Sequence, residues 1–377
     1  MKVRVTQIDI ARVAGVHNTT VSLSLRNSRL IPDATRKRIQ AIAGEMGYSP
    51  DPALRALAAY RNSRRPMPHA NTIAYITDWE TKWGWRDQPW HEKYFLGAQR
   101  KAAEIGYPIE HFWLGEAGMS QKRLSCMLLH RGITGVVLAT HRMCGGLSDI
   151  DWSRLSAVKI GCFPQVPALN QVAVDHGSVV NLSMQRVLSA GCKRVGLVMS
   201  RCWDDLFNQA WSKAFFAEQY VIPARDRLPI LPLGSSRDDL PSNNANQGRA
   251  DDTRAFARWY RDYRPDAIVG LAPQVLAHVE RLGLVVPRDV AYADLFLDHP
   301  GDELAGVCQN CERVGELAVE LLAGQLQQNV FGVPAVATTT SVAGAWSDGA
   351  SLPATGLPMA GEVVLATAAI VKADLVA

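Results

Sequence analysis

The sequence predicts a multidomain protein in which a small all-α headpiece precedes a larger α/β domain made of two doubly wound, parallel-sheet subdomains. The length of 377 residues is greater than a single small domain requires. The first sixty residues carry apolar side chains at helical spacing, whereas from Asn71 onward short apolar runs alternate with amphipathic stretches. Such alternation is typical of parallel sheets that helices cover on both faces.

Charge is distributed unevenly along the chain. Residues 1–66 contain twelve Lys and Arg and four Asp and Glu, which gives a net charge of +8. The whole chain carries +4, so the remainder carries −4. A basic head on a slightly acidic body indicates a polyanionic partner for the head alone. An ordinary solvated basic surface is the alternative, and the charge by itself does not exclude it.

The chain lacks the marks of a secreted or membrane protein. Residues 1–16 contain no apolar signal core, and the longest apolar run, 363–371, is about half of the roughly 20 residues that a spanning helix needs. The seven cysteines show no disulfide framework, which indicates free thiols in a reducing cytoplasm. We therefore expect a cytoplasmic protein without a membrane partner.

Motifs for catalysis or metal binding are also missing. Cys308 and Cys311 form a single CxxC, for which two ordinary thiols are favoured over metal or redox chemistry. The sequence has no phosphate-loop, nucleophile-elbow, zinc-protease or dinucleotide motif in a suitable context. The prediction is a protein that is not an enzyme and that needs no cofactor or metal.

Residues 6–25 are predicted to form two short helices joined by a tight turn. Thr6 is a suitable N-cap, and Asp9 completes a capping box. The first helix then has an apolar stripe made of Ile10, Val13 and Ala14. Gly15 permits the sharp turn, and a second helix follows over about 18–25.

The second helix has two different faces. Val21 and Leu25 lie four residues apart and are expected to pack on the first helix. The outward face carries Asn18, Thr19, Ser22 and Leu23. Amides and hydroxyls can hydrogen-bond base edges in the major groove of DNA, and an apolar group can contact a thymine methyl. The alternative, a helical hairpin with a polar face, leaves the local charge and the outward Leu23 unexplained.

A third helix is expected to begin near Pro32, where a missing N–H has little consequence, and to end at Gly47. Its apolar positions follow helical spacing: Ile39, Ile42, Ala43 and Met46. Three basic residues near its start, Arg36, Lys37 and Arg38, are suited to contact phosphates.

Residues 3–58 resemble the headpiece of the LacI/GalR (lactose-repressor) family of bacterial transcription regulators. The motifs that carry the resemblance are D-I-A-x-x-A-G-V, T-V-S, T-R-x-R-I and G-Y-x-P, all in register and without a gap. The resemblance implies a homodimeric regulator, expected to be a repressor, that binds a pseudo-palindromic double-stranded DNA operator. It also implies phosphate contacts from Thr6, His17, Asn27, Thr35 and Arg36.

In this family the segment after the headpiece forms a hinge helix on DNA, which here corresponds to 52–58. The resemblance implies minor-groove contacts from Ala53, Arg55 and Leu57. An inserted apolar side chain such as Leu57 unstacks a base step and bends the duplex, although ordinary packing is the alternative. This sequence departs from the family at Leu23, where Arg is common, and at His17, where Ser is usual.

The larger domain is predicted from its alternating segments. Strands are expected at 72–77, 108–113, 133–139, 157–161, 171–174, 194–199, 266–270, 289–293 and 304–308, and helices at 91–106, 120–131, 175–190 and 204–219. The order resembles the family's periplasmic-binding-protein-like regulatory domain. We expect a headpiece with hinge over 1–62, a linker over 63–70, this domain over 71–350 with its subdomains split near 170–175, and a poorly ordered tail over 351–377.

Ligands of open parallel sheets bind beyond the carboxyl ends of strands. The first such segment contains Asp78 and an unusual number of tryptophans, of which Trp79 and Trp85 are expected to stack on a sugar-like effector. A lid over the core or a dimer contact are the alternatives. The resemblance adds Asp175, which can also cap the following helix, and Asp294, which lies near a family position occupied here by Phe296.

The sequence therefore predicts a sequence-specific DNA-binding transcription regulator whose partners are operator DNA, a carbohydrate effector and a second copy of the chain. The competing hypothesis is a solute-binding or sensor protein whose basic head binds DNA without sequence preference.

Overall fold

The computed structural model describes residues 5–28, 30–48, 72–139, 146–161, 167–234, 250–272, 274–301 and 303–353. The chain divides into two compact units, residues 1–173 with 311–340 and residues 174–310 with 341–377. The chain passes from one unit to the other after Ala173, Asn310 and Thr340. No helix among the described residues is long and apolar enough to cross a membrane.

The described part of the N-terminal headpiece, residues 5–28 and 30–48, forms three helices: α1 (Gln7–Ala14), α2 (Asn18–Leu25) and α3 (Asp33–Glu45). They begin and end where the local chemistry favours it. The Thr6 hydroxyl accepts from the backbone N–H of Asp9 while the Asp9 carboxylate accepts from the backbone N–H of Thr6, as predicted for a capping box. Gly15 has φ 63°, a left-handed conformation that closes the turn before α2.

A small apolar core holds the headpiece together. Ile10, Val21 and Ile39, one from each helix, are fully buried. The predicted stripe on α1 is wrong at Val13, which is 62% exposed, whereas Ala11 is buried. Helical spacing locates an apolar stripe, but it does not reveal which flank of the stripe the neighbouring helices cover.

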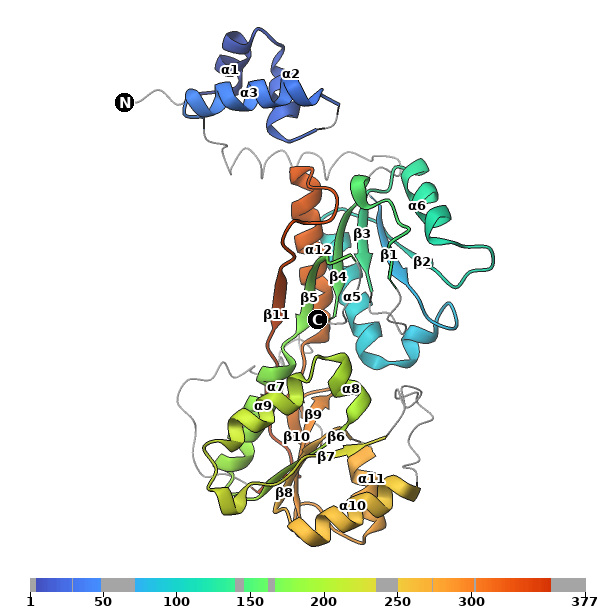
Figure 1. Cartoon of the computed structure of the whole chain (residues 1–377), viewed down its shortest axis with the longest axis vertical. Coiled ribbons are helices and arrows are strands. Elements are labelled where there is room, and N and C mark those ends of the chain that lie inside the picture. The colour runs from blue at the N-terminus through green and yellow to red at the C-terminus, as the bar shows by residue number, and fades with distance from the viewer. Residues whose placement is uncertain are drawn as a thin grey trace, which may run out of the picture. The chain divides into compact units, whose positions relative to one another are not determined.

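The first unit is built on a parallel sheet with strand order β11-β5-β4-β3-β1-β2 (Figure 1). Its strands are β1 (Ile73–Thr77), β2 (Ile109–Trp113), β3 (Gly135–Leu138), β4 (Ser156–Ile160), β5 (Asn170–Val174) and β11 (Thr339–Val342). Its helical segments are η1 (Gly84–Asp87), α5 (Pro89–Glu104), α6 (Gln121–His130), η2 (Trp152–Arg154) and α12 (Cys311–Gln328).

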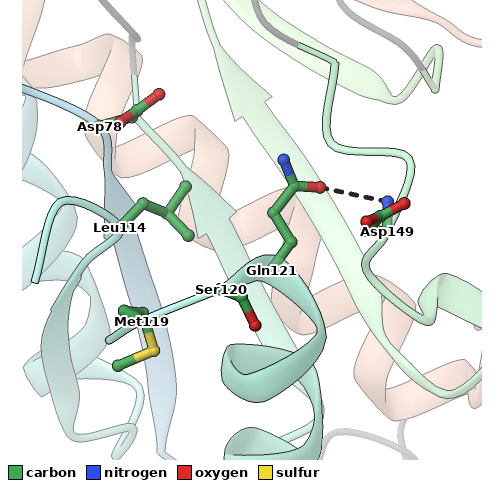
Figure 2. A pocket seen from close by; sticks show the side chains of 6 residues that line it. All are labelled: Asp78, Leu114, Met119, Ser120, Gln121 and Asp149. Atoms are coloured by element: carbon green, nitrogen blue, oxygen red, sulfur yellow. Dashed lines mark hydrogen bonds between the residues drawn. The ribbon is translucent and has the colours of Figure 1, made fainter. Parts of the chain in front are cut away.

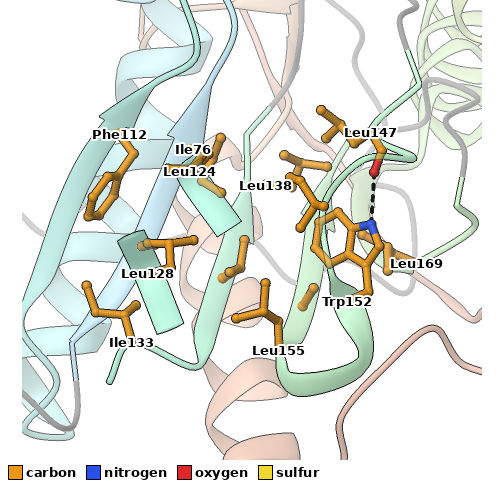
Figure 3. Close-up of a cluster of buried hydrophobic side chains, with 14 residues drawn as sticks. Ile76, Phe112, Leu124, Leu128, Ile133, Leu138, Leu147, Trp152, Leu155 and Leu169 are labelled. Carbon is orange, nitrogen blue, oxygen red and sulfur yellow. Dashed lines mark hydrogen bonds between the residues drawn. The ribbon is translucent and has the colours of Figure 1, made fainter. Parts of the chain in front are cut away.

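Both faces of this sheet are buried, as continuous apolar strands require. On one face Ile76 and its neighbours pack against Leu124 and Leu128 of α6, and the Trp152 indole N–H donates to the Leu147 carbonyl at 3.0 Å (Figure 3). On the other face α5 and α12 lie against each other and α12 covers β3 and β4. Successive side chains of a strand point to opposite faces, so each strand of the sheet contributes to both layers.

The second unit has the strand order β12-β10-β9-β8-β6-β7, in which β12 is antiparallel to β10 and the other described pairs are parallel. Its strands are β6 (Val195–Ser200), β7 (Leu231–Leu233), β8 (Ala267–Gly270), β9 (Ala291–Leu297), β10 (Ala305–Cys308) and β12 (Ala345–Ser347). Its helical segments are α7 (His176–Ser189), α8 (Arg201–Leu206), α9 (Ala210–Gln219), η3 (Ala224–Asp226), α10 (Ala250–Tyr263) and α11 (Gln274–Arg281).

The single helix predicted over 204–219 is wrong, because the chain forms α8 and α9 with a break between them. Asn208 and Gln209 have φ 56° and 53°, which no helix continues through. The buried Asp204 carboxylate accepts from the backbone N–H groups of Trp211 and Ser212 at 3.1 and 3.2 Å, so a residue of α8 satisfies the first donors of α9.

Glycines allow α5 and α12 to approach closely. A Cβ at Gly97 would collide with the backbone oxygen of Glu312, and a Cβ at Gly315 would collide with that of Tyr94. Gly324, also in α12, has no atom within 4 Å of the place where a Cβ would lie. The two α12 glycines therefore differ only in whether a neighbouring backbone fills the space.

Replacing Gly315 with Ala is expected to destabilise the protein by about 1–3 kcal/mol, because the methyl group forces the α5 backbone away. Gly324→Ala is the matched control and is expected to stabilise the protein by roughly 0.5–1 kcal/mol through helix propensity. Urea unfolding followed by circular dichroism measures both effects. If both variants changed the free energy of unfolding by the same amount and in the same direction, the close packing of α5 on α12 would be contradicted.

Candidate nucleic-acid interface and effector cavity

Helix α2 presents the four residues predicted to contact bases on the side opposite its buried face. Asn18 and Thr19 are exposed, and Ser22 and Leu23 are partly buried. Val21 is fully buried on the other side, in the core with α1 and α3. One face of this short helix thus carries the Asn18 amide, the hydroxyls of Thr19 and Ser22, and the apolar side chain of Leu23.

The N-terminus of α2 is capped by His17. Its ring Nδ1 accepts from the backbone N–H of Thr19 at 3.3 Å and lies 3.0 Å from the Thr19 hydroxyl. The His17 side chain is exposed beside these bonds. A cap of this kind satisfies one of the N–H groups that a helix leaves unpaired at its start. From the sequence, His17 was expected to contact phosphate, and its role as a cap was not foreseen.

The other residues predicted to contact phosphates also lie at helix ends. Thr6 caps α1, and Asn27 follows α2 with φ 57° and accepts from Gln40 Nε2 at 2.7 Å. Thr35 lies in the first turn of α3. Helix N-termini attract phosphate oxygens because their N–H groups point outward and their dipole is positive there.

Asp33 organises the basic start of α3. Its carboxylate contacts Arg36 Nη2 at 2.5 Å and Lys37 Nζ at 2.9 Å, and the pKa of Asp33 is lowered, chiefly by the hydrogen bond from Lys37. The Arg36 guanidinium also donates to the Ser28 carbonyl at 3.4 Å, and 21% of its side chain is exposed. Arg36 is therefore held in one orientation at the end of α3 that faces the α2–α3 connection.

The hinge residues Ala53, Arg55 and Leu57 lie outside the described residues. Their predicted minor-groove contacts stay predictions.

A cavity of about 370 Å³ lies at the carboxyl edge of the first sheet (Figure 2). It is lined by Asp78, which follows β1, by Leu114, which follows β2, and by Met119, Ser120, Gln121 and Asp149. Gln121 accepts from the backbone N–H of Asp149 at 3.1 Å, and burial raises the pKa of the Asp78 carboxyl. The lining combines apolar and hydrogen-bonding groups, as small-molecule sites commonly do.

Of these lining residues only Asp78 was proposed as a ligand contact from the sequence. The others were missed because they come from the β2–α6 connection and from the segment before η2. Ser120 is the N-cap of α6, where its side-chain oxygen accepts from the backbone N–H of Arg123 at 3.2 Å. The sequence feature that could have identified Leu114 as a lining residue is its position directly after a parallel strand, where ligands of such sheets bind.

Of the tryptophans after β1, Trp85 belongs to the protein core, whereas Trp83 is 46% exposed. Trp85 is 1% exposed, and its ring lies 5.1 Å from that of Phe95 and 6.2 Å from that of Tyr75. The prediction that Trp85 stacks on a ligand is therefore wrong for this structure, because its ring faces are occupied by other aromatic rings. Trp79 is partly buried and packs edge-on against His91 at 5.0 Å.

Two carboxylates assigned to the effector lie in the second unit and serve its fold. Asp175 caps α7 by accepting from the backbone N–H of Ser178 at 2.9 Å. Asp294 is 2% exposed within β9 and accepts from the N–H groups of Ala272 and Phe296 at 3.1 and 2.7 Å. Burial raises the pKa of Asp294 to about 7. The prediction that Asp294 contacts a ligand is wrong for this structure, since its carboxylate is turned inward.

Within the described ranges, no group of three or more His, Cys, Asp or Glu side chains is arranged to hold a metal ion.

Comparison with known proteins identifies both parts of the chain. The family model of bacterial regulatory proteins, lacI family, matches residues 6–51, and the model of a periplasmic binding protein-like domain matches residues 184–345. The transcriptional repressor PurR of Photobacterium profundum is 39% identical over 337 residues, which cover 83% of this chain and 90% of the relative.

Solved structures share the fold across most of the chain. The complex of the regulator CelR with cellobiose superposes with a TM-score of 0.52 at 17% identity and covers 92% of this chain and 100% of its own. The lac repressor dimer bound to operator and the anti-inducer ONPF gives 0.52 at 16% identity, with 93% and 100% covered. Together with the helix-turn-helix headpiece and the two parallel sheets, the similarity to PurR shows that this chain belongs to the LacI family of DNA-binding transcription regulators.

Proposed function

We propose that this regulator is a repressor that binds a pseudo-palindromic operator as a homodimer, in the cytoplasm, under the control of a small sugar-like effector. The observation that carries the proposal is the exposed face of α2, which a fully buried residue, Val21, holds outward. A helix fixed in this way enters the major groove with its side chains in a defined register. The relative PurR is named a repressor, which supports the direction of regulation.

In this proposal Asn18, Thr19, Ser22 and Leu23 contact bases, because they lie on the side of α2 opposite the buried Val21. Recognition of a guanine at this position would need a side chain that donates two hydrogen bonds, as Arg does, whereas Leu23 offers only an apolar contact. The operator is therefore expected to differ from those of family members that carry Arg here. Thr6, His17, Asn27, Thr35 and Arg36 contact phosphates. These phosphate contacts position the headpiece on the duplex and do not themselves read the base sequence.

A twofold dimer presents two copies of α2 to two half-sites of an operator. Ala53, Arg55 and Leu57 are assigned to the minor groove between these half-sites, in accordance with the family resemblance. The lac repressor, which shares the fold, was solved as a dimer bound to its operator. A partner copy is therefore the natural means of placing two headpieces on one site.

The effector is assigned to the cavity at the carboxyl edge of the first sheet, with Asp78 as a hydrogen-bond acceptor for ligand hydroxyls. CelR, which shares the fold, was solved with the disaccharide cellobiose. Trp79, which directly follows Asp78 in the chain, remains a candidate at the edge of this cavity. Asp175 belongs to the second unit and is kept as a separate ligand candidate. An effector changes DNA affinity only if it binds two states of the dimer with different affinities.

The DNA-binding proposal is tested by selection from random duplex DNA with the full-length protein and with the fragment 71–377. We expect the full-length protein to enrich one site with two half-sites related by twofold symmetry, about 10³-fold or more over random DNA. The fragment is expected to enrich none. Enrichment of a site by the fragment would contradict the role of the headpiece in sequence recognition. Steep salt dependence without any enriched site for the full chain would favour a sensor with only nonspecific DNA affinity.

The effector proposal is tested by thermal unfolding of the full-length protein with cellobiose and a panel of other mono- and disaccharides. A ligand at a hundred times its dissociation constant stabilises the native state by about 2.7 kcal/mol. At least one sugar is expected to raise the melting temperature of the unmodified protein, and Asp78→Ala is expected to lose most of that rise. Glu116→Ala, an exposed carboxylate outside the lining, serves as the control. The assignment of the effector to this cavity would be contradicted if Asp78→Ala showed the full rise in melting temperature, or if no sugar raised the melting temperature of the unmodified protein.

A further inference from the structure

The cap of α2 has an unusual composition, because an imidazole fills a position that side-chain oxygens usually occupy. His17 Nδ1 lies 3.3 Å from the backbone nitrogen of Thr19 and 3.0 Å from its hydroxyl oxygen. One ring nitrogen thus contacts both polar groups of a residue on the exposed face of the recognition helix. The direction of these two hydrogen bonds determines what Thr19 can offer to a base.

The backbone N–H fixes the direction of the first bond. A peptide nitrogen can only donate, so Nδ1 must be the acceptor and carries no hydrogen. The imidazole is then neutral with its single hydrogen on Nε2. A positively charged ring would present a second N–H to the peptide N–H and would place a cation at the positive end of the helix dipole, which is unfavourable.

The second bond follows from the first. Because Nδ1 bears no hydrogen, the contact with the Thr19 hydroxyl is a hydrogen bond only if the hydroxyl donates to Nδ1. A hydroxyl has one hydrogen and two lone pairs. Once its hydrogen points at His17, the exposed Thr19 oxygen can only accept.

We propose that His17 is a specificity-determining residue, which turns Thr19 into an obligate acceptor and so directs it to the exocyclic amino group of adenine or cytosine. In the major groove these two bases present amino donors, whereas guanine and thymine present oxygen acceptors at the corresponding place. An accepting Thr19 faced with guanine O6 or thymine O4 meets a second acceptor and forms no bond. The inference rests on the proposed contact of α2 with bases and adds to it the class of base that one residue selects.

The proposal also separates His17 from the charged phosphate contacts. A neutral ring that donates through Nε2 can orient on a phosphate without releasing a condensed counterion. His17 therefore affects the sequence preference through Thr19, and it does not contribute to the salt dependence of DNA binding.

The test is selection from random duplex DNA by the full-length protein, its Thr19→Ser and Thr19→Val variants, and His17→Ala. The unmodified protein is expected to show one half-site position at which adenine and cytosine are favoured over guanine and thymine by about 3- to 10-fold. Thr19→Ser keeps the hydroxyl and is expected to keep the preference. Thr19→Val has the same shape without the hydroxyl and is expected to lose the preference at that position alone.

His17→Ala releases the Thr19 hydroxyl, which can then donate as well as accept. Guanine and thymine are expected to become tolerated at the same position, while the other positions of the site are retained. Retention of the other half-site positions reports that α2 is still folded and seated in the groove in this variant, so the effect of His17 is measured at the Thr19 position alone.

Three results would overturn the inference and leave the proposed function standing. The position that depends on Thr19 could favour guanine or thymine, Thr19→Val could leave every position unchanged, or a folded His17→Ala could keep the preference. A full-length protein that enriches no site would instead refute the proposed function itself. Each outcome therefore identifies which of the two claims has failed.

Discussion

The headpiece depends first on the packing of three side chains, Ile10, Val21 and Ile39. Each comes from a different helix and none is exposed to solvent. The position of Val21 fixes the rotation of α2 about its own axis, because turning the helix would exchange a buried apolar group for a polar one. The set of side chains on the face of α2 opposite Val21 follows from that rotation. A core of few residues can thus orient a helix whose own sequence is mostly polar.

The two parallel sheets apply a similar constraint on a larger scale. Strands buried on both faces leave only the ends of the sheet for ligands, so Asp78 and Leu114 reach the cavity because they directly follow β1 and β2. The close contact of α5 with α12 through Gly97 and Gly315 covers the opposite face of the first sheet. Burial elsewhere thus restricts the place where a small molecule can be recognised, just as it restricts the face of α2 in the headpiece.

Much of this arrangement could be predicted from the sequence where local chemistry decides it. The capping box of Thr6 and Asp9 and the bounds of α2 are local and were predicted correctly. Trp85 and Asp294 were assigned wrongly, because whether an aromatic ring or a carboxylate faces a ligand or the core depends on residues distant in sequence. The break before α9 was missed, although Asn208 is of a residue type that is enriched at positive φ, because Gln209 beside it seldom adopts such a conformation.

The central claim is that the exposed face of α2 selects the DNA sequence while the rest of the headpiece supplies affinity. The most direct measurement compares the affinity for the selected operator with that for random DNA after Asn18, Thr19, Ser22 and Leu23 are all replaced by Ala. We predict that the ratio falls to about one while nonspecific affinity and its salt dependence are unchanged, because the phosphate contacts remain. A variant that keeps its fold and still prefers the operator by the original ratio would contradict the account.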